Sequence, residues 1–458
     1  DINTKAVTPI PFHVKATRRI FDALHSYHEV ETPTVAPKMI RSAELSPRGD
    51  AVIFEALGKI WIRPLPDGKP HRLTKQNDHR EAYPSFSRDG KRVVYVSWDD
   101  ASLGAIRVFN VSGGDGRLVS KEPGHYIQPV FSNDGSRIVY VSVNGSVLVS
   151  GAQSRERGLY VMTLADGQMR RLSKEGNRPH FGAEIDRVYF MTVNSEGKED
   201  VRSLKSMRLD GSEERTHAVS DEATEFRVSP DGRWLAFREN FNAHLIAFPR
   251  GAKMLSASPE QKALPMARLS QDSGAWISFT ADSKRVAWTS GSQLQIREID
   301  DLFSFSRSTA EPKPVTSIQF DVTMSPQMPR GTLALVGARL ITMRGDEVLE
   351  SGTIIIRDGK IVAVGSVSSV EIPKDATRFD MKGATILPGL VDVHWHGDVG
   401  LSGLVPEQNW MLLSAMSFGV TTIHDPAPDA ESFFASAEMA KAGQLTAPRM
   451  FSTSRTLY

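Results

Sequence analysis

The sequence predicts a multidomain, mainly β protein in which a β-propeller is followed by a small β-sandwich and then by the first units of a (β/α)8 TIM barrel. Three observations predict this order: a turn phrase that recurs along residues 39–316, two apolar strands joined by Asp358-Gly359, and a strand–helix–strand–helix run after residue 386. At 458 residues, the chain is long enough for about three domains of ~150 residues each.

The recurring phrase is clearest in Phe86-Ser87-Arg88-Asp89-Gly90. Its Ser or Thr stands at positions 46, 87, 132, 229 and 280, and with a degenerate copy at 181–184 the copies are 41 to 51 residues apart. Asp-Gly supplies the positive φ that a tight turn between two strands requires. Alternating apolar segments follow the turns, and roughly four strands per ~45 residues is the blade of a β-propeller. We therefore predict six blades over residues 39–316, with residues 1–38 as a linker or closing segment.

Residues 317–385 are expected to hold a linker and the small β-sandwich. Proline and glycine residues break the chain at 326–331, and apolar strands then run over 333–342 and 352–365. Asp358-Gly359 predicts a hairpin turn within the second of these segments.

Residues 386–458 predict the first two β/α units of a barrel. The segments 386–393 and 420–423 read as buried strands, and 406–418 and 429–442 as helices followed by glycine. Only 62 residues follow His396, which at roughly 30 residues per unit make about two of eight units. We expect the remaining barrel segments of the same protein to lie outside this chain.

The candidate metal ligands are His394 and His396, at the end of the first of these strands. Residues i and i+2 of a strand project from one face about 6.5 Å apart, so both imidazoles can reach one ion through bonds of ~2.1 Å. Asp392 shares this face and is a candidate to orient an imidazole or to add a carboxylate. His424 and Asp425 end the second strand at the same rim; alternatively, they form a turn that starts a helix, with a satisfied histidine.

Composition excludes several functional classes. Lys plus Arg is 55 and Asp plus Glu is 54, and this balance argues against a protein that coats nucleic acid. No apolar run reaches the ~20 residues of a membrane helix, so no membrane span is expected. The chain has no cysteine, which excludes disulfides, thiol nucleophiles and cysteine zinc sites. A cysteine-free chain that begins at Asp1 suits an exported protein, although the cytoplasm stays an alternative.

Three short segments of the propeller region have competing interpretations. Trp98-Asp99-Asp100 is expected to serve turn formation rather than metal binding. Asp78-His79 and Gly124-His125-Tyr126 begin blades at matching positions, where they either satisfy buried backbone groups or contribute to a ligand site.

These motifs resemble those of two known families. Residues 331–365, the run Ile386-Leu387-Pro388-Gly389-Leu390-Val391-Asp392-Val393-His394-Trp395-His396-Gly397 and residues 419–426 resemble the metal-dependent amidohydrolase superfamily, and its imidazolonepropionase and prolidase-like branch in particular. The repeats resemble TolB-like (PD40, WD40-like) propellers, and such fusions are often periplasmic or secreted.

The amidohydrolase resemblance implies one or two divalent metal ions, usually zinc, with His394 and His396 as ligands. It also implies a carboxylated Lys or Glu, two further His and an Asp on later strands. The general base is therefore expected on a later strand, and no catalytic residue is assigned within this chain. Asp398, His424 and Asp425 are candidates for the substrate pocket.

We therefore predict a metal-dependent hydrolase that acts on C–N bonds of small molecules or short peptides. The alternative is a propeller and barrel scaffold that has lost catalysis and binds peptides or envelope partners. Assembly into a homo-oligomer is compatible with either function.

Overall fold

The computed structural model describes residues 11–19, 32–113, 116–143, 157–194, 200–249, 251, 254–303, 314–400 and 403–453. The chain divides into two units, Asp1–Thr32 and Pro33–Tyr458. Residues 11–19 of the first unit are exposed and carry no helix or strand. All elements described below belong to the second unit.

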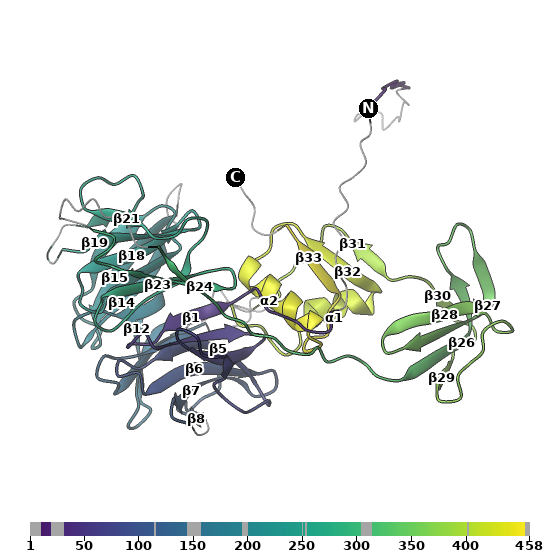
Figure 1. Cartoon of the computed structure of the whole chain (residues 1–458), viewed down its shortest axis with the longest axis horizontal. Coiled ribbons are helices and arrows are strands. Elements are labelled where there is room, and N and C mark those ends of the chain that lie inside the picture. The colour runs from purple at the N-terminus through teal and green to yellow at the C-terminus, as the bar shows by residue number, and fades with distance from the viewer. Residues whose placement is uncertain are drawn as a thin grey trace, which may run out of the picture. The chain divides into compact units, whose positions relative to one another are not determined.

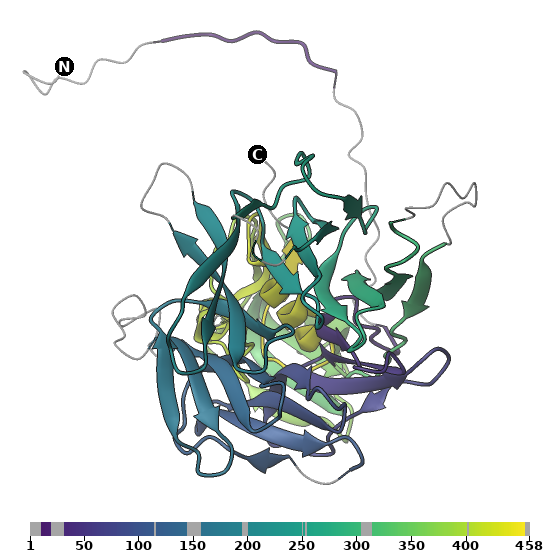
Figure 2. The same cartoon turned by 90° about the vertical axis from the view of Figure 1, so that its left-hand side faces the viewer.

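Six sheets of four or five strands make up residues 41–319 (Figures 1 and 2). The first three sheets contain β1 (Arg41–Leu45), β2 (Ala51–Ala56), β3 (Lys59–Pro64) and β4 (His71–Arg72); β5 (Arg80–Phe86), β6 (Arg92–Asp99), β7 (Leu103–Asn110) and β8 (Arg117–Leu118); and β9 (Tyr126–Phe131), β10 (Arg137–Ser142), β11 (Gly158–Thr163) and β12 (Met169–Ser173). The last three contain β13 (Asn177–Phe181), β14 (Arg187–Asn194), β15 (Val201–Arg208), β16 (Arg215–Ser220) and β20 (Leu255–Ser256); β17 (Glu225–Val228), β18 (Trp234–Glu239), β19 (Asn242–Ala247) and β21 (Met266–Arg268); and β22 (Ala275–Phe279), β23 (Arg285–Ser290), β24 (Gln293–Glu298) and β25 (Thr316–Gln319). All strand pairs of these six sheets are antiparallel except the parallel pair of β16 and β20.

The first strands of the six sheets form a closed ring. Each packs against the first strand of the next sheet, and β22 of the last sheet packs against β1 of the first. The sheets are therefore the six blades of a β-propeller, and the predicted mainly β architecture is confirmed.

Side chains near the propeller axis link neighbouring blades through the backbone. Their acceptor atoms each take an N–H from the next blade: Glu44 from Phe86 (3.0 Å), Gln128 from Arg178 (2.6 Å), His180 from Val228 (3.0 Å), Glu225 from Ile277 (2.8 Å) and Ser278 from Leu45 (3.1 Å). These bonds explain why polar side chains occur in the interior of the ring, because buried N–H groups need partners.

The recurring turn phrase has a local hydrogen-bonding cause. Ser87 Oγ donates to Asp89 Oδ1 at 2.6 Å and accepts from the Arg92 N–H at 3.0 Å. The same pair of bonds recurs at Ser132, Ser229 and Thr280.

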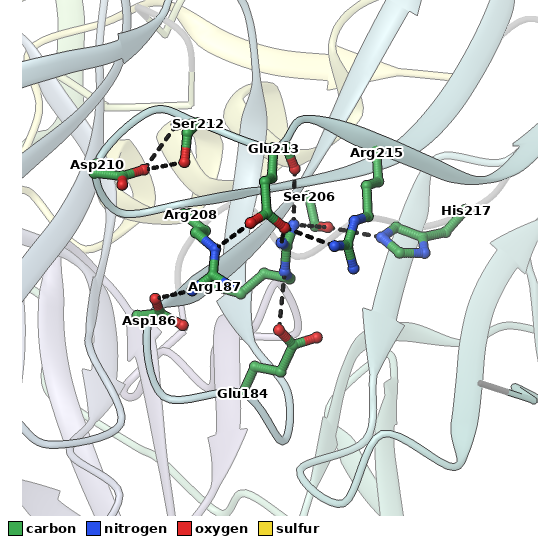
Figure 3. A network of polar contacts seen from close by, with 10 residues as sticks. All are labelled: Glu184, Asp186, Arg187, Ser206, Arg208, Asp210, Ser212, Glu213, Arg215 and His217. Atoms are coloured by element: carbon green, nitrogen blue, oxygen red, sulfur yellow. Dashed lines mark hydrogen bonds and ion pairs between the residues drawn. The ribbon is translucent and has the colours of Figure 1, made fainter. Parts of the chain in front are cut away.

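In the fourth blade the turn phrase is degenerate, and hydrogen bonds from the buried Arg187 side chain are found there instead of the Ser or Thr bonds (Figure 3). Arg187 is fully buried and donates to Glu184 at 3.1 Å, to Glu213 at 2.9 Å and to Ser206 Oγ at 3.1 Å. Ser206 Oγ also lies 2.7 Å from His217 Nε2. Partners from three segments of this blade therefore meet at one guanidinium.

After the propeller, a five-stranded sheet corresponds to the predicted sandwich module. It contains β26 (Thr332–Ile341), β27 (Val348–Arg357), β28 (Lys360–Ser366), β29 (Thr377–Asp380) and β30 (Thr385–Ile386). Asp358 and Gly359 form the expected turn, with φ of 50° and 81°. Within the described residues this module has one sheet and a small core around Ala338, Leu340 and Ile354. The second layer of the expected sandwich is not among these residues.

The last element is a three-stranded parallel sheet with two helices. Its strands are β31 (Leu390–Asp392), β32 (Val420–Asp425) and β33 (Arg449–Ser452), connected by α1 (Trp410–Ser417) and α2 (Ala430–Lys441). This is the predicted run of two β/α units, while a closed barrel is not found in the described part of the chain. Leu412, Ile423 and Phe433 are buried in its core.

Two boundaries in this region differ from the sequence prediction. The first strand was expected over 386–393, but Pro388-Gly389 interrupts it and Ile386 pairs with β26. The first helix was expected from residue 406, but it begins at Trp410 because the Asn409 side chain caps the N–H groups of Met411 and Leu412.

The structure also bears on membrane insertion. Neither of the two helices in the described residues is long and apolar enough to cross a bilayer.

Candidate functional site

The ends of β31 and β32 bring the sequence-predicted site residues together. The two strands run parallel, with Asp392 beside Ile423, and the Trp395 N–H donates to the His424 carbonyl at 2.9 Å. Gly389 permits this close packing, since a Cβ there would lie 2.7 Å from Thr421 Cβ. Both motifs therefore lie at one edge of the sheet, as parallel strands require.

His394 and His396 converge through their ring nitrogens. Their Nε2 atoms are 3.1 Å apart, and the ring centroids are 4.9 Å apart at an interplanar angle of 72°. Both residues are exposed. The rings thus meet at a solvent-accessible strand end.

Asp425 fixes the orientation of one of these rings. Its Oδ1 lies 3.2 Å from His396 Nδ1, and its side chain is 2% exposed. The same oxygen accepts the Ala427 N–H at 3.0 Å. Because an ionised carboxylate only accepts, the ring proton of neutral His396 belongs on Nδ1 and leaves an acceptor lone pair on Nε2. A carboxylate on the outer nitrogen is the usual support of a metal-binding histidine.

The two imidazoles fit part of a metal site. Ligands bonded at ~2.1 Å to a tetrahedral ion stand about 3.4 Å apart, close to the 3.1 Å between these Nε2 atoms. A protein zinc site has at least three protein ligands. Among the described residues, no group of three or more His, Asp or Glu side chains is arranged to hold an ion. The pair therefore supplies two donors of a larger set.

The other candidates have different surroundings. Asp392 accepts the His394 N–H at 3.1 Å, so its carboxylate shapes the turn after β31. Asp398 is exposed; its carboxylate accepts the Gly400 N–H at 3.3 Å and its carbonyl accepts from Asn409 at 3.0 Å. These bonds hold Asp398 in the loop before α1. His424 is half-buried and contributes its carbonyl to the contact with Trp395.

One contact to this loop comes from the propeller and was missed in the sequence. The carboxylate of Asp100 accepts the N–H groups of Glu407 at 3.1 Å and Gln408 at 2.7 Å. Asp99 accepts from the Ser102 hydroxyl and amide, as expected for turn chemistry. Asp100 also lies in this turn and accepts from Trp98 Nε1 at 2.7 Å, so the interpretation of Trp98-Asp99-Asp100 as a turn holds, and Asp100 in addition contacts the loop before α1. A partner 307 residues away has no local signal in the sequence.

Comparisons with known proteins add two kinds of similarity. No family model matches the chain. It is 40% identical over 78 residues to an enamidase from Eubacterium barkeri (17% of this chain, 20% of the relative) and 46% identical over 57 residues to an imidazolonepropionase from Alkaliphilus metalliredigens (12% and 14%). It therefore spans about a fifth or less of these relatives' length.

Among solved structures, TolB from Acinetobacter baumannii matches with a TM-score of 0.38 and 16% identity, over 51% of this chain and 55% of that one. The chain is similar in sequence to amidohydrolase-family enzymes, and a TolB propeller is among its structural neighbours.

Proposed function

We propose that this chain carries part of the active site of a metal-dependent hydrolase that acts on C–N bonds of small amides or short peptides. The observation that carries the proposal is the convergence of His394 and His396, with Nε2 atoms 3.1 Å apart and His396 backed by buried Asp425. Sequence similarity to an enamidase and an imidazolonepropionase supports hydrolysis of C–N bonds at the level of the family.

Each residue has a distinct role in this proposal. His394 and His396 are ligands of a divalent metal ion, for which zinc is the first candidate. The complete site holds one or two such ions. A bound zinc ion would lower the pKa of a coordinated water to about 7 and polarise the scissile carbonyl. Asp425 keeps the Nδ1 proton of His396 in place, so that Nε2 stays a lone-pair donor. Asp398 and His424 are proposed to face the substrate.

The remaining ligands and the general base are proposed to come from further segments of the same protein. Exposed apolar side chains support this. Val391 and Val393, in and after β31, are 61% and 73% exposed, and Trp410 and Phe418, at either end of α1, are 54% and 80% exposed. Parallel sheets are normally covered on both faces. Additional β/α units would cover these side chains and bring further polar strand ends to the same rim. Export is proposed as well, supported by the absence of cysteine.

Metal titration of histidine variants tests the proposal. Co²⁺ is added to the 458-residue chain and its visible absorption is followed for the parent protein, His394→Ala, His396→Ala and the control Lys374→Ala, an exposed site in the sheet module. We expect weak binding by the parent and the control, because two donors do not complete a site, and loss of binding in both histidine variants. Binding that persists in both would overturn the assignment.

Hydrolysis is measured on the chain extended by its flanking sequence, with a panel of N-acyl amides. Stoichiometric zinc, with activity that His394→Ala abolishes, is the expected result. A folded extended protein that takes up no metal and hydrolyses nothing would favour the scaffold alternative.

A further inference from the structure

A cavity of about 430 Å³ is formed by the second blade and the segments on either side of it. His79, Arg107 and Ser120 contribute polar groups to its lining, and Leu103 and Leu118 contribute apolar walls. Its volume lies within the range of about 300–1,000 Å³ that is typical of small-molecule sites. None of these residues belongs to the histidine site described above.

His79 lines this cavity and carries an unpaired acceptor atom. Its side chain is 7% exposed, and its Nδ1 lies 3.1 Å from Asp78 Oδ1. Nε2 is buried and has no hydrogen-bond partner among the described residues. Burial, reinforced by the nearby Arg107 guanidinium, lowers the pKa of His79 to about 4. The ring is therefore neutral at pH 7, with its proton on Nδ1 toward Asp78 and a lone pair on Nε2.

Arg107 brings an oriented cation. Its Nε donates to Ser97 Oγ at 2.9 Å and its Nη1 donates to the Gly116 carbonyl at 3.1 Å. Guanidinium has five N–H groups, so these two bonds fix its plane and leave donors for a further acceptor. Arginine in a fixed plane is suited to bidentate recognition of a carboxylate.

We propose that this cavity is a binding site for a small hydroxylated monocarboxylate, such as a sugar acid. Arg107 binds the carboxylate, and Nε2 of His79 accepts a hydrogen bond from a ligand hydroxyl. The apolar walls at Leu103 and Leu118 take the carbon chain. This chemistry uses His79 and Arg107 at once: a plain carboxylate would leave the His79 acceptor unpaired, and an uncharged polyol would leave the remaining donors of Arg107 without an anion.

The other charges at the cavity favour a single negative charge on the ligand. Asp78, Asp99 and Glu122 also line it, with Lys121 as a second cation. The Asp78 carboxylate lies beside His79, and that of Asp99 is bonded to Ser102. Three carboxylates would repel a polyanion such as a polyphosphate, whereas one carboxylate seated on Arg107 can be accommodated.

Calorimetry with three six-carbon compounds tests this site on the 458-residue chain. Gluconate has the carboxylate and the hydroxyls, hexanoate has the carboxylate alone, and sorbitol has the hydroxyls alone. We expect saturable 1:1 binding of gluconate, and binding of the other two that is weaker by tenfold or more, since each lacks one hydrogen-bonding partner. Gluconate that binds no better than sorbitol would overturn the proposal.

Variants assign the binding to these two side chains. Arg107→Met and His79→Leu are each expected to weaken gluconate binding about tenfold or more. His79→Gln, which keeps a side-chain acceptor, is expected to retain more of it than His79→Leu. Arg117→Met and His71→Leu, outside the cavity lining, serve as matched controls and are expected to bind like the parent chain.

Circular dichroism verifies that each variant is folded. Should Arg107→Met unfold, Arg107→Lys keeps the charge without the planar fork, and its gluconate binding must still fall. Parent-like affinity in folded variants of both Arg107 and His79 would exclude the site.

Discussion

The carboxylate of Asp425, on β32, lies 3.2 Å from Nδ1 of His396, which follows β31. The carboxylate is buried while the imidazole is 58% exposed, so a rigid group of the core holds a solvent-facing ring. This arrangement leaves the opposite ring nitrogen turned toward His394. The sequence predicts Asp425 as a candidate for the substrate pocket, and from this contact we propose that it positions the His396 ring.

Asp425→Asn is expected to weaken Co²⁺ binding by the chain about 10- to 100-fold, as is typical when a carboxylate behind a metal-binding histidine is removed. An amide in this place can present its NH₂ group to Nδ1 and favour the wrong tautomer. Cobalt absorption titrations measure the change, with the exposed Asp375→Asn as the control. Unchanged affinity in Asp425→Asn would show that His396 does not depend on this carboxylate.

Gly389→Ala is expected to disturb the same site from a distance, through the packing of β31 on β32. The added Cβ would lie 2.7 Å from Thr421 Cβ, and a β-branched side chain on a strand has little room to move. We expect a loss of about 1–3 kcal/mol in the free energy of unfolding, together with weaker Co²⁺ binding. The double variant Gly389→Ala/Thr421→Ala should recover part of both, because it removes the rest of the Thr421 side chain beyond Cβ. If neither stability nor Co²⁺ binding recovers in the double variant, contact with the Thr421 side chain is not the cause of the Gly389→Ala effect.

His180 should make the stability of the propeller depend on pH. Its Nδ1 lies 3.1 Å from the Arg178 carbonyl and its Nε2 accepts the Val228 N–H at 3.0 Å, so both nitrogens serve the neutral ring. Burial lowers the pKa of His180 from 6.5 to about 3. The folded state therefore resists protonation. Stability is complete above pH 6.5 and is lost as the pH falls toward 3.

At pH 5 the loss from this one residue is about 2 kcal/mol relative to pH 7. Urea unfolding at both pH values measures it. His180→Gln keeps an acceptor but does not titrate, so its pH 7 to pH 5 loss should be smaller by about that amount. The exposed His71→Gln should lose as much as the parent chain. Equal losses in His180→Gln and the parent would contradict the prediction.

Arg187 should contribute far more to stability than its neighbour Arg208, although both pair with Glu213. The Arg187 side chain is 0% exposed and the Arg208 side chain is 37% exposed. Arg187→Met removes bonds to three partners in a buried setting and should cost about 2–4 kcal/mol. Arg208→Met breaks surface pairs and should cost at most about 1 kcal/mol. Urea denaturation compares them, and equal costs would show that burial of Arg187 adds nothing.

Local patterns were predictable from the sequence, and distant pairings were not. The blades were visible because the Ser87–Asp89 turn and its repeats are bonded within six residues, so each copy carries its own signal. The histidine pair was visible because its members lie two residues apart directly after a predicted strand, although β31 itself ends at Asp392. The pairing of Asp425 with His396 could not be predicted from the sequence, because it depends on how two strands align. The same holds for Asp100 and Gln408, whose contact joins residues 308 positions apart.

The junction between the first and the last blade differs from the other junctions of the propeller. Apart from β20, which joins the fourth blade from a segment between β19 and β21, the blades follow one another along the chain, and the circle is completed where β22 packs against β1, with the Leu45 N–H donating to Ser278. In the described residues no sheet contains strands of both the first and the last blade. The two ends are held instead by the antiparallel bridge between Val35 and Met324 and by Arg63, which pairs with Asp321 at 2.6 Å. Every other pair of neighbouring blades is joined by a connecting segment of the chain, whereas these two are not. We therefore expect amide hydrogens along this junction to exchange before those between any other pair of blades.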